Sequence, residues 1–201
     1  MLFQLFTNPL FFAVWAVSLI VAVTVHEFAH AYVADKLGDP TPRLMGRVTL
    51  NPLAHLDPMG TVALLFLGFG WGRPVPFDPF NLQSPKRDAA LISLAGPASN
   101  IGMVMAITLL HYVTGLPLGL TIIIVQLNLM LAVFNLIPVH PLDGFKIVGG
   151  LLTDEQADSW YRLEPYGMYL LLLFILPITP NGPLVSFIIG PILTFITAAL
   201  F

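Results

Sequence analysis

The stretch from Leu10 to Ala34 sets the strongest limit on what this chain can fold into. Its only acidic, basic or histidine side chains are His26, Glu27 and His30. As a helix, the stretch is long enough to cross the ~30 Å hydrocarbon core of a bilayer. Lipid offers no partner to a backbone N–H or C=O, so a spanning segment satisfies these groups internally as a helix. We therefore predict a membrane protein of the all-α class.

Four more apolar stretches follow, at residues 89–113, 119–137, 166–178 and 183–201. Only 9% of the residues are charged, whereas soluble domains have about a quarter. The composition thus predicts a polytopic helix bundle of about five spans in one domain, residues 1–201. Its core would be residues 10–150 and its C-terminal helical hairpin 163–201. The apolar segment Thr61–Trp71 is too short to cross, which favours a re-entrant or extended piece, and Gly96-Pro97 is expected to interrupt the second span.

The basic residues predict how the chain is oriented. All eight fall between the first and second spans or between the third and fourth spans. If residues 61–71 do not cross the membrane, all eight basic residues lie on one face of it. By the positive-inside rule that face is cytosolic. The N-terminus would then lie outside, the C-terminus in the cytosol and the lipid bilayer around the chain. No basic run interleaves with aromatic residues, so we expect no nucleic-acid partner.

The sequence His26-Glu27-Phe28-Ala29-His30 carries the chemistry. On a helix, His26 and His30 lie on one face and can direct two imidazole nitrogens at one metal ion, with Glu27 beside the open position as a general base. With no cysteine, the strong zinc ligands left are His and carboxylate. The alternative is a polar cluster satisfied by its neighbours at a helix end. Glu27 is the one acidic residue well inside an apolar helix, which favours function.

A catalytic zinc ion needs a third protein ligand. His111 is excluded because it lies at the far end of the second span. Of the others, Asp143 is favoured over more distant positions, since it follows the third span in proline-broken backbone at the depth of the histidines. The same position also suits an Asp that caps a helix at the interface. The remaining candidates are Asp57, His55 and His140, with Asp78 and Asp88 more remote.

Four motifs together resemble the site-2 protease family of intramembrane zinc metalloproteases, in its compact branch without PDZ or CBS domains. They are HEFAH at 26–30, NPLAHLDPMGT at 51–61, GPASN at 96–100 and NLIPVHPLDG at 135–144. The resemblance implies one Zn²⁺ held by His26, His30 and Asp143, with Glu27 as base and acid. It also implies that Asn135 holds substrate or supports the oxyanion and that Asn100 lies near the site.

The resemblance implies hydrolysis of peptide bonds in or near transmembrane segments of other proteins, which would be its substrates and partners. The site would face the cytosolic side. His55 and His140 are interpreted as structural or as supporting the ligands. Two other functions remain open: a zinc-binding scaffold or transporter that does not cleave, and an assembly factor with a degenerate site. The sequence does not indicate an oligomeric state.

Overall fold

The first apolar stretch forms one unbroken helix in the computed structural model, which describes residues 2–67, 70–180 and 182–201. This helix, α2, runs from Pro9 to Lys36. Asn8 caps its start, since the Asn8 side chain accepts a hydrogen bond from the Phe11 N–H at 3.1 Å. Pro9 fits the first turn because no helical partner exists there for the N–H that proline lacks. The helix predicted from Leu10 to Ala34 is confirmed.

Two further long helices follow, α5 (Pro85–Thr114) and α6 (Leu118–Asn135). With α2, these are the helices of the described chain that are long and apolar enough to cross a membrane. The helix α5 ends at Thr114 and is capped by Gly115, whose φ of 70° is the left-handed conformation that closes many helices. The predicted interruption at Gly96-Pro97 is wrong: Pro97 lies inside a continuous α5. Packing of α5 between α2 and α6 outweighs the one backbone hydrogen bond that Pro97 cannot donate.

The other elements are shorter. The α-helices are α1 (Leu2–Thr7), α3 (Thr41–Leu44), α4 (Pro58–Leu67), α7 (Asp143–Leu151), α8 (Asp154–Tyr161), α9 (Glu164–Ile175) and α10 (Leu184–Leu200), and the 3₁₀ turns are η1 (Pro52–Ala54) and η2 (Pro79–Asn81). Between described residues, β pairing is limited to isolated bridges, Leu56 with Gly72 and Thr179 with Gly182. The predicted all-α class is confirmed. Of the five predicted spans, the last two correspond to α9 and α10, with 12 and 17 residues.

The predicted re-entrant piece corresponds in part to α4. This helix has 10 residues and a length of about 15 Å, half of the hydrocarbon thickness. Residues 68 and 69 of the predicted piece lie outside the described residues. The chain then returns in extended form through Gly72, which bridges to Leu56.

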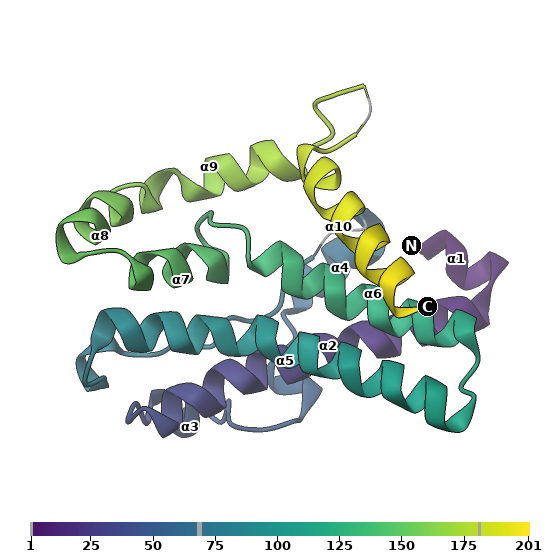
Figure 1. Cartoon of the computed structure of the whole chain (residues 1–201), viewed down its shortest axis with the longest axis horizontal. Helices are drawn as coiled ribbons and strands as arrows, with labels where there is room; N and C mark the ends of the chain where they lie inside the picture. The colour runs from purple at the N-terminus through teal and green to yellow at the C-terminus, as the bar shows by residue number, and fades with distance from the viewer. Residues whose placement is uncertain (1, 68–69, 181) are drawn as a thin grey trace.

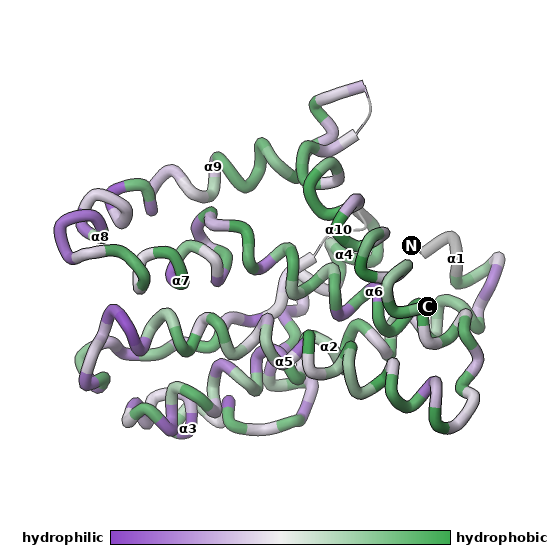
Figure 2. The backbone as a smooth tube through the Cα atoms, viewed as in Figure 1, coloured by the Kyte–Doolittle hydropathy of each residue, from purple (hydrophilic) through white to green (hydrophobic). Residues whose placement is uncertain are grey.

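The helix α5 is the centre of the bundle, with α2, α6 and α7 packed against it. Figure 1 shows the chain turning at α8 after α7, α9 running back above α7, and α10 lying across α6. Figure 2 shows hydrophilic segments gathered at the end of the molecule that holds α3, α8 and the start of α5. There Lys86 joins α5 to the start of α8 through Asp154 at 2.5 Å and the Leu152 carbonyl at 2.8 Å. His26 and His30 lie on α2 before its last residue, Lys36, and so further inside the molecule than that polar end.

Candidate metal centre

Two helices bring the predicted ligands together. His26 and His30 are one turn apart on α2, and their ring centroids are 4.6 Å apart. Asp143 is the first residue of α7, after a turn that includes the cis His140–Pro141 bond. The turn is tight, because a Cβ at Gly144 would collide with the carbonyl oxygens of Leu136 and Ile137. The chain therefore folds back directly after α6 and directs Asp143 toward α2.

The three side chains converge on one buried point. The Nε2 atoms of His26 and His30 each lie 3.2 Å from Oδ2 of Asp143. One ligand atom from each residue lies within 4.8 Å of the other two. Both histidines are buried and Asp143 is half-buried. Of the described His, Asp and Glu residues, these form the group that could hold a metal ion.

The second nitrogen of each histidine fixes which nitrogen can bind a metal. His26 Nδ1 lies 2.7 Å from Oδ1 of Asn100, and His30 Nδ1 lies 2.7 Å from the carbonyl oxygen of Ile92. Both partners are acceptors, so each Nδ1 carries the proton and each neutral ring presents a lone pair at Nε2. Two lone pairs and a carboxylate oxygen thus face one another.

This arrangement fits a metal cation. Oδ2 of Asp143 is buried and accepts no hydrogen bond from any described residue, although two nitrogens lie close to it. Three facing acceptors repel one another unless a cation lies between them. Two imidazoles and one carboxylate are a ligand set typical of catalytic zinc, which keeps a fourth position open.

Gly96 makes room for this point. A Cβ there would collide with Nε2 of His30 and with the ring of His26. Ile92, Gly96 and Asn100 follow one another at intervals of four along α5, so they share the face that packs on α2. One face of α5 therefore supplies the hydrogen-bond acceptors for both Nδ1 atoms, from Ile92 and Asn100. Gly96, which lies between these two residues, leaves the space that both Nε2 atoms face.

Glu27 lies against an extended segment of backbone. A Cβ at Gly72 would be 3.4 Å from Oε1 of Glu27. The backbone of Arg73 donates to the His55 carbonyl at 2.7 Å, which pairs this segment with the chain before α4. Glu27 is half-buried and its carboxylate accepts no hydrogen bond from the described residues. Its oxygens are therefore available to a water molecule or a substrate.

Arg47 holds that extended segment in place. Its guanidinium is buried and donates to the carbonyl oxygens of Ala54, Arg73 and Pro74. Burial lowers the pKa of Arg47, and the neighbouring charge of Arg73 lowers it further, whereas Glu27 acts to raise it. Arg47 thus ties the chain before α4 to the segment that follows Gly72, and it adds a positive charge near Glu27.

The other predicted site residues differ in their surroundings. Asn100 is buried and contacts His26, as described above. Asn135 donates to the Leu131 carbonyl of its own helix at 2.9 Å. His55 is buried, with Nε2 2.8 Å from the Thr49 carbonyl and no partner at Nδ1 among the described residues. His140 faces α9, where its Nδ1 is 3.7 Å from Oε1 of Glu164.

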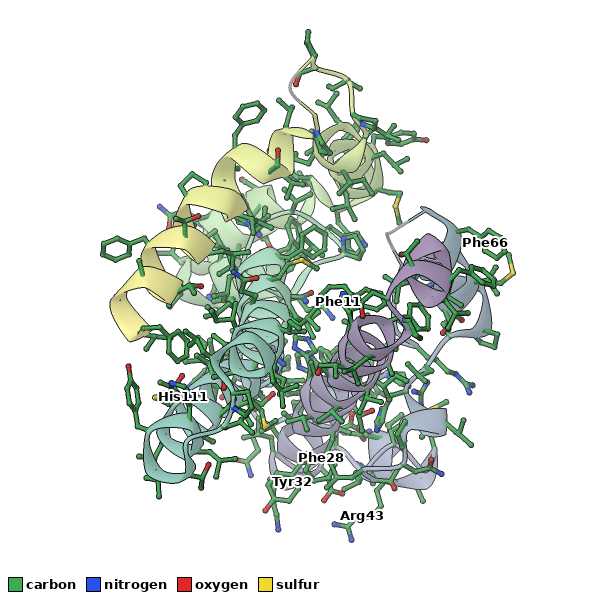
Figure 3. The ribbon with its side chains drawn as sticks, turned by 90° about the vertical axis from the view of Figure 1, so that its right-hand side faces the viewer. Phe11, Phe28, Tyr32, Arg43, Phe66 and His111 are labelled. Atoms are coloured by element: carbon green, nitrogen blue, oxygen red, sulfur yellow. The ribbon has the colours of Figure 1, made fainter. Side chains whose placement is uncertain are left out.

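Asn128, Gly96 and Arg47 were not among the predicted site residues. Asn128 is buried in α6, and its Oδ1 accepts a hydrogen bond from Asn100 Nδ2 at 2.9 Å. A signal for Asn128 exists in the sequence, because an amide in an apolar span lies two turns before Asn135 on the same helix face. Phe28 and Tyr32, labelled in Figure 3, stack on each other along α2 with ring centroids 5.7 Å apart, and Tyr32 is exposed.

Comparison with known proteins finds relatives that carry zinc metalloprotease names. The chain is 40% identical over 190 residues to "Putative zinc metalloprotease YwhC" of Bacillus subtilis. The matched region covers 88% of this chain and 84% of that protein. It is 32% identical over 184 residues to "Putative zinc metalloprotease Rip2" of Mycolicibacterium smegmatis, covering 83% and 65%. It is 32% identical over 159 residues to "Zinc metalloprotease MJ0392" of Methanocaldococcus jannaschii, covering 77% and 39%. No protein-family model and no solved structure matches the chain.

Proposed function

Because the chain belongs to the zinc metalloprotease family of these relatives, in agreement with its resemblance to compact site-2 proteases, we propose that it is an intramembrane zinc metalloendopeptidase. It hydrolyses peptide bonds in or beside transmembrane segments of other membrane proteins. One observation carries the proposal. The Nε2 lone pairs of two histidines on α2, a helix long and apolar enough to span a membrane, meet an unpaired carboxylate oxygen of α7, and Glu27 is on the same helix as the histidines.

His26, His30 and Asp143 hold one zinc ion in this proposal. When bound, zinc polarises the scissile carbonyl and lowers the pKa of a water molecule to about 7. The ligands come from α2 and α7, so the site forms only when the turn after α6 brings Asp143 back to α2. The fourth position is left to water and substrate.

Glu27 is the general base and then the general acid. Its free carboxylate takes a proton from the attacking water and gives it to the leaving amine nitrogen, which completes the cleavage of the C–N bond. Asn135 donates a hydrogen bond to the reacting carbonyl oxygen. Its Nδ2 carries two hydrogens, of which one is donated to the Leu131 carbonyl of α6, so the other is left for the substrate carbonyl.

The substrate must unwind before it is cut. In a helix, each carbonyl is held by the N–H four residues later and is shielded from water. Segments with helix-weakening residues near the cut are therefore preferred. We propose that such a peptide docks along the chain that follows Gly72, the residue beside Glu27. We also propose that the N-terminus lies outside and that the site opens toward the cytosol, because the basic residues are confined to one set of connections.

A cleavage assay tests the proposal. The full chain is co-expressed with candidate transmembrane substrates, as wild type and as Glu27→Gln, and both forms are purified for metal analysis. The proposal expects zinc in both forms and cleavage by the wild type alone. Zinc binding with no cleavage of any unwound transmembrane segment would favour a scaffold, and equal cleavage by Glu27→Gln would refute the role of the base.

A further inference from the structure

A line of hydrogen bonds runs from α6 through α5 to the metal site on α2. Asn128 Nδ2 donates to the Ile124 carbonyl at 2.9 Å, which turns Oδ1 of Asn128 toward α5. That oxygen accepts from Asn100 Nδ2 at 2.9 Å, and Oδ1 of Asn100 accepts from His26 Nδ1 at 2.7 Å. Both asparagines are buried, with exposures of 0% for Asn100 and 1% for Asn128.

The direction of each bond follows from the groups at the ends. A backbone carbonyl is only an acceptor, so the Ile124 carbonyl requires the amino group of Asn128 to face it. The Ala22 carbonyl, 3.2 Å from Asn100 Nδ2, imposes the same condition on Asn100. If the Asn100 amide turned over, its oxygen would face two acceptors and its amino group would face His26. The acceptors Ala22 O and Asn128 Oδ1 therefore keep Oδ1 of Asn100 toward His26.

We infer that Asn128 is a positioning residue of the metal centre, which acts through Asn100 to hold His26 with its proton on Nδ1 and its Nε2 lone pair toward the metal. The inference rests on the proposed zinc site. The two histidines differ in this respect. The Nδ1 of His30 is held by the Ile92 backbone carbonyl, so the orientation of His30 does not depend on a side chain. The ring of His26 depends on two asparagines from two other helices.

A mutant cycle on metal affinity tests this role. Zinc affinity of the detergent-solubilised full chain is measured by competition with a chelator for wild type, Asn100→Leu, Asn128→Leu and the double variant. Loss of the residue that hydrogen-bonds a metal-bound histidine typically weakens metal binding by about 10- to 100-fold, and we expect this loss for Asn100→Leu. For Asn128→Leu, which acts one step further away, we expect zinc affinity to fall by about 3- to 10-fold. If Asn128 acts through Asn100, the double variant binds as weakly as Asn100→Leu alone.

Thr121→Val is the matched control. Thr121 is a buried, hydrogen-bonded residue of the same helix, two turns before Asn128, and its hydroxyl bonds to the Pro117 carbonyl rather than toward the site. We expect this variant to bind zinc as the wild type does. Asn128→Ala removes the same acceptor without added bulk and decides the test if Asn128→Leu does not fold.

Nitrogen-15 NMR of histidine-labelled protein gives a readout that lost packing alone would not change. In the zinc-free protein, where no metal fixes the ring, we expect a protonated Nδ1 of His26 in the wild type and a mixture of tautomers in Asn128→Leu, with His30 unchanged. Unaltered affinity and tautomer in both Asn128 variants would overturn the inference, as would losses that multiply in the double variant. If the wild type binds no zinc, the proposed function itself fails. Zinc binding without cleavage would refute the protease and leave the role of Asn128 standing.

Discussion

The interior shared by α2, α5, α6 and α7 and the C-terminal pair α9 and α10 are both built from apolar helices, yet they differ in how their polar groups are satisfied. In the interior, His26, Asn100 and Asn128 bond across three helices. In α10, the Thr194 hydroxyl bonds to the Gly190 carbonyl of its own helix at 3.0 Å. Directional bonds between helices fix one arrangement, whereas apolar side chains facing lipid accept many. Substitutions should therefore have large effects in the first region and small ones in the second.

The largest effect is expected at Asp143, which joins α7 to the metal site. Asp143→Ala removes one of the three ligands, so zinc should fall from about one per chain to a small fraction and cleavage by about 10³-fold or more. Metal analysis of the purified protein and the cleavage assay measure both. Full zinc content in this variant would show that Asp143 is not a ligand.

Gly96 should be almost as sensitive, although it carries no chemistry. Gly96→Ala places a methyl group against both Nε2 atoms, so we expect zinc affinity to fall by about 100-fold. Gly102→Ala is the matched control on the same helix, because a Cβ there meets nothing within 4 Å. Equal zinc affinities in the two variants would contradict the close passage of α5 across the site.

Asp39 extends the comparison to the polar connection after α2. It is buried and accepts hydrogen bonds from the Thr41 hydroxyl at 2.6 Å, the Asp78 backbone at 2.7 Å and Asn81 at 2.8 Å. Burial acts to raise the pKa of Asp39, but these hydrogen bonds outweigh it and the pKa lies below its usual 3.8. The folded state therefore favours the ionised form, so its contribution to stability is complete above the unfolded pKa and is lost as the pH falls through the folded pKa.

Asp39→Ala should lower the midpoint of thermal unfolding at neutral pH by on the order of 5 °C. The difference from the wild type should shrink as the pH falls below the usual carboxyl range. Unfolding of both proteins followed from pH 7 to pH 3 checks this. A difference that grows toward acid would show that the sign of the Asp39 contribution is wrong.

The smallest effect is expected in the C-terminal pair. Phe195 in α10 is 75% exposed, so Phe195→Leu exchanges one exposed apolar side chain for another. We expect zinc affinity and cleavage to stay within about twofold of the wild type. A loss comparable with that of Gly96→Ala would mean that α10 takes part in the site or in substrate entry, and the contrast between the two regions would fail.

The sequence predicts the long helices well and their detailed contacts poorly. Uninterrupted apolar length identified α2, α5 and α6 because lipid leaves a spanning backbone no alternative to the helix. The continuity of α5 through Pro97 was missed because neighbouring helices compensate for the lost hydrogen bond. The polar stretch after Thr153, which falls between the predicted spans, forms α8, whose start is closed by hydrogen bonds between Thr153 and Gln156.

The candidate site shows the same division. Spacing on one helix is sufficient to pair His26 with His30, whereas position only nominates Asp143 among several candidates and the family resemblance selects it. Asn128 is not predicted at all, and Gly96 only as an interruption of the second span, because their importance depends on which faces of α5 and α6 meet α2. That is a property of packing, and a pattern along one segment does not contain it.

The most direct test of the account is the X-ray absorption spectrum of the purified wild-type chain at the zinc edge, with the zinc content measured on the same sample. The account predicts about one zinc per chain, bound only by nitrogen and oxygen at about 2.0–2.2 Å, with outer-shell scattering from two imidazoles. Zinc absent from the chain, or a spectrum with fewer than two imidazoles, would contradict the claim that His26, His30 and Asp143 form the metal centre.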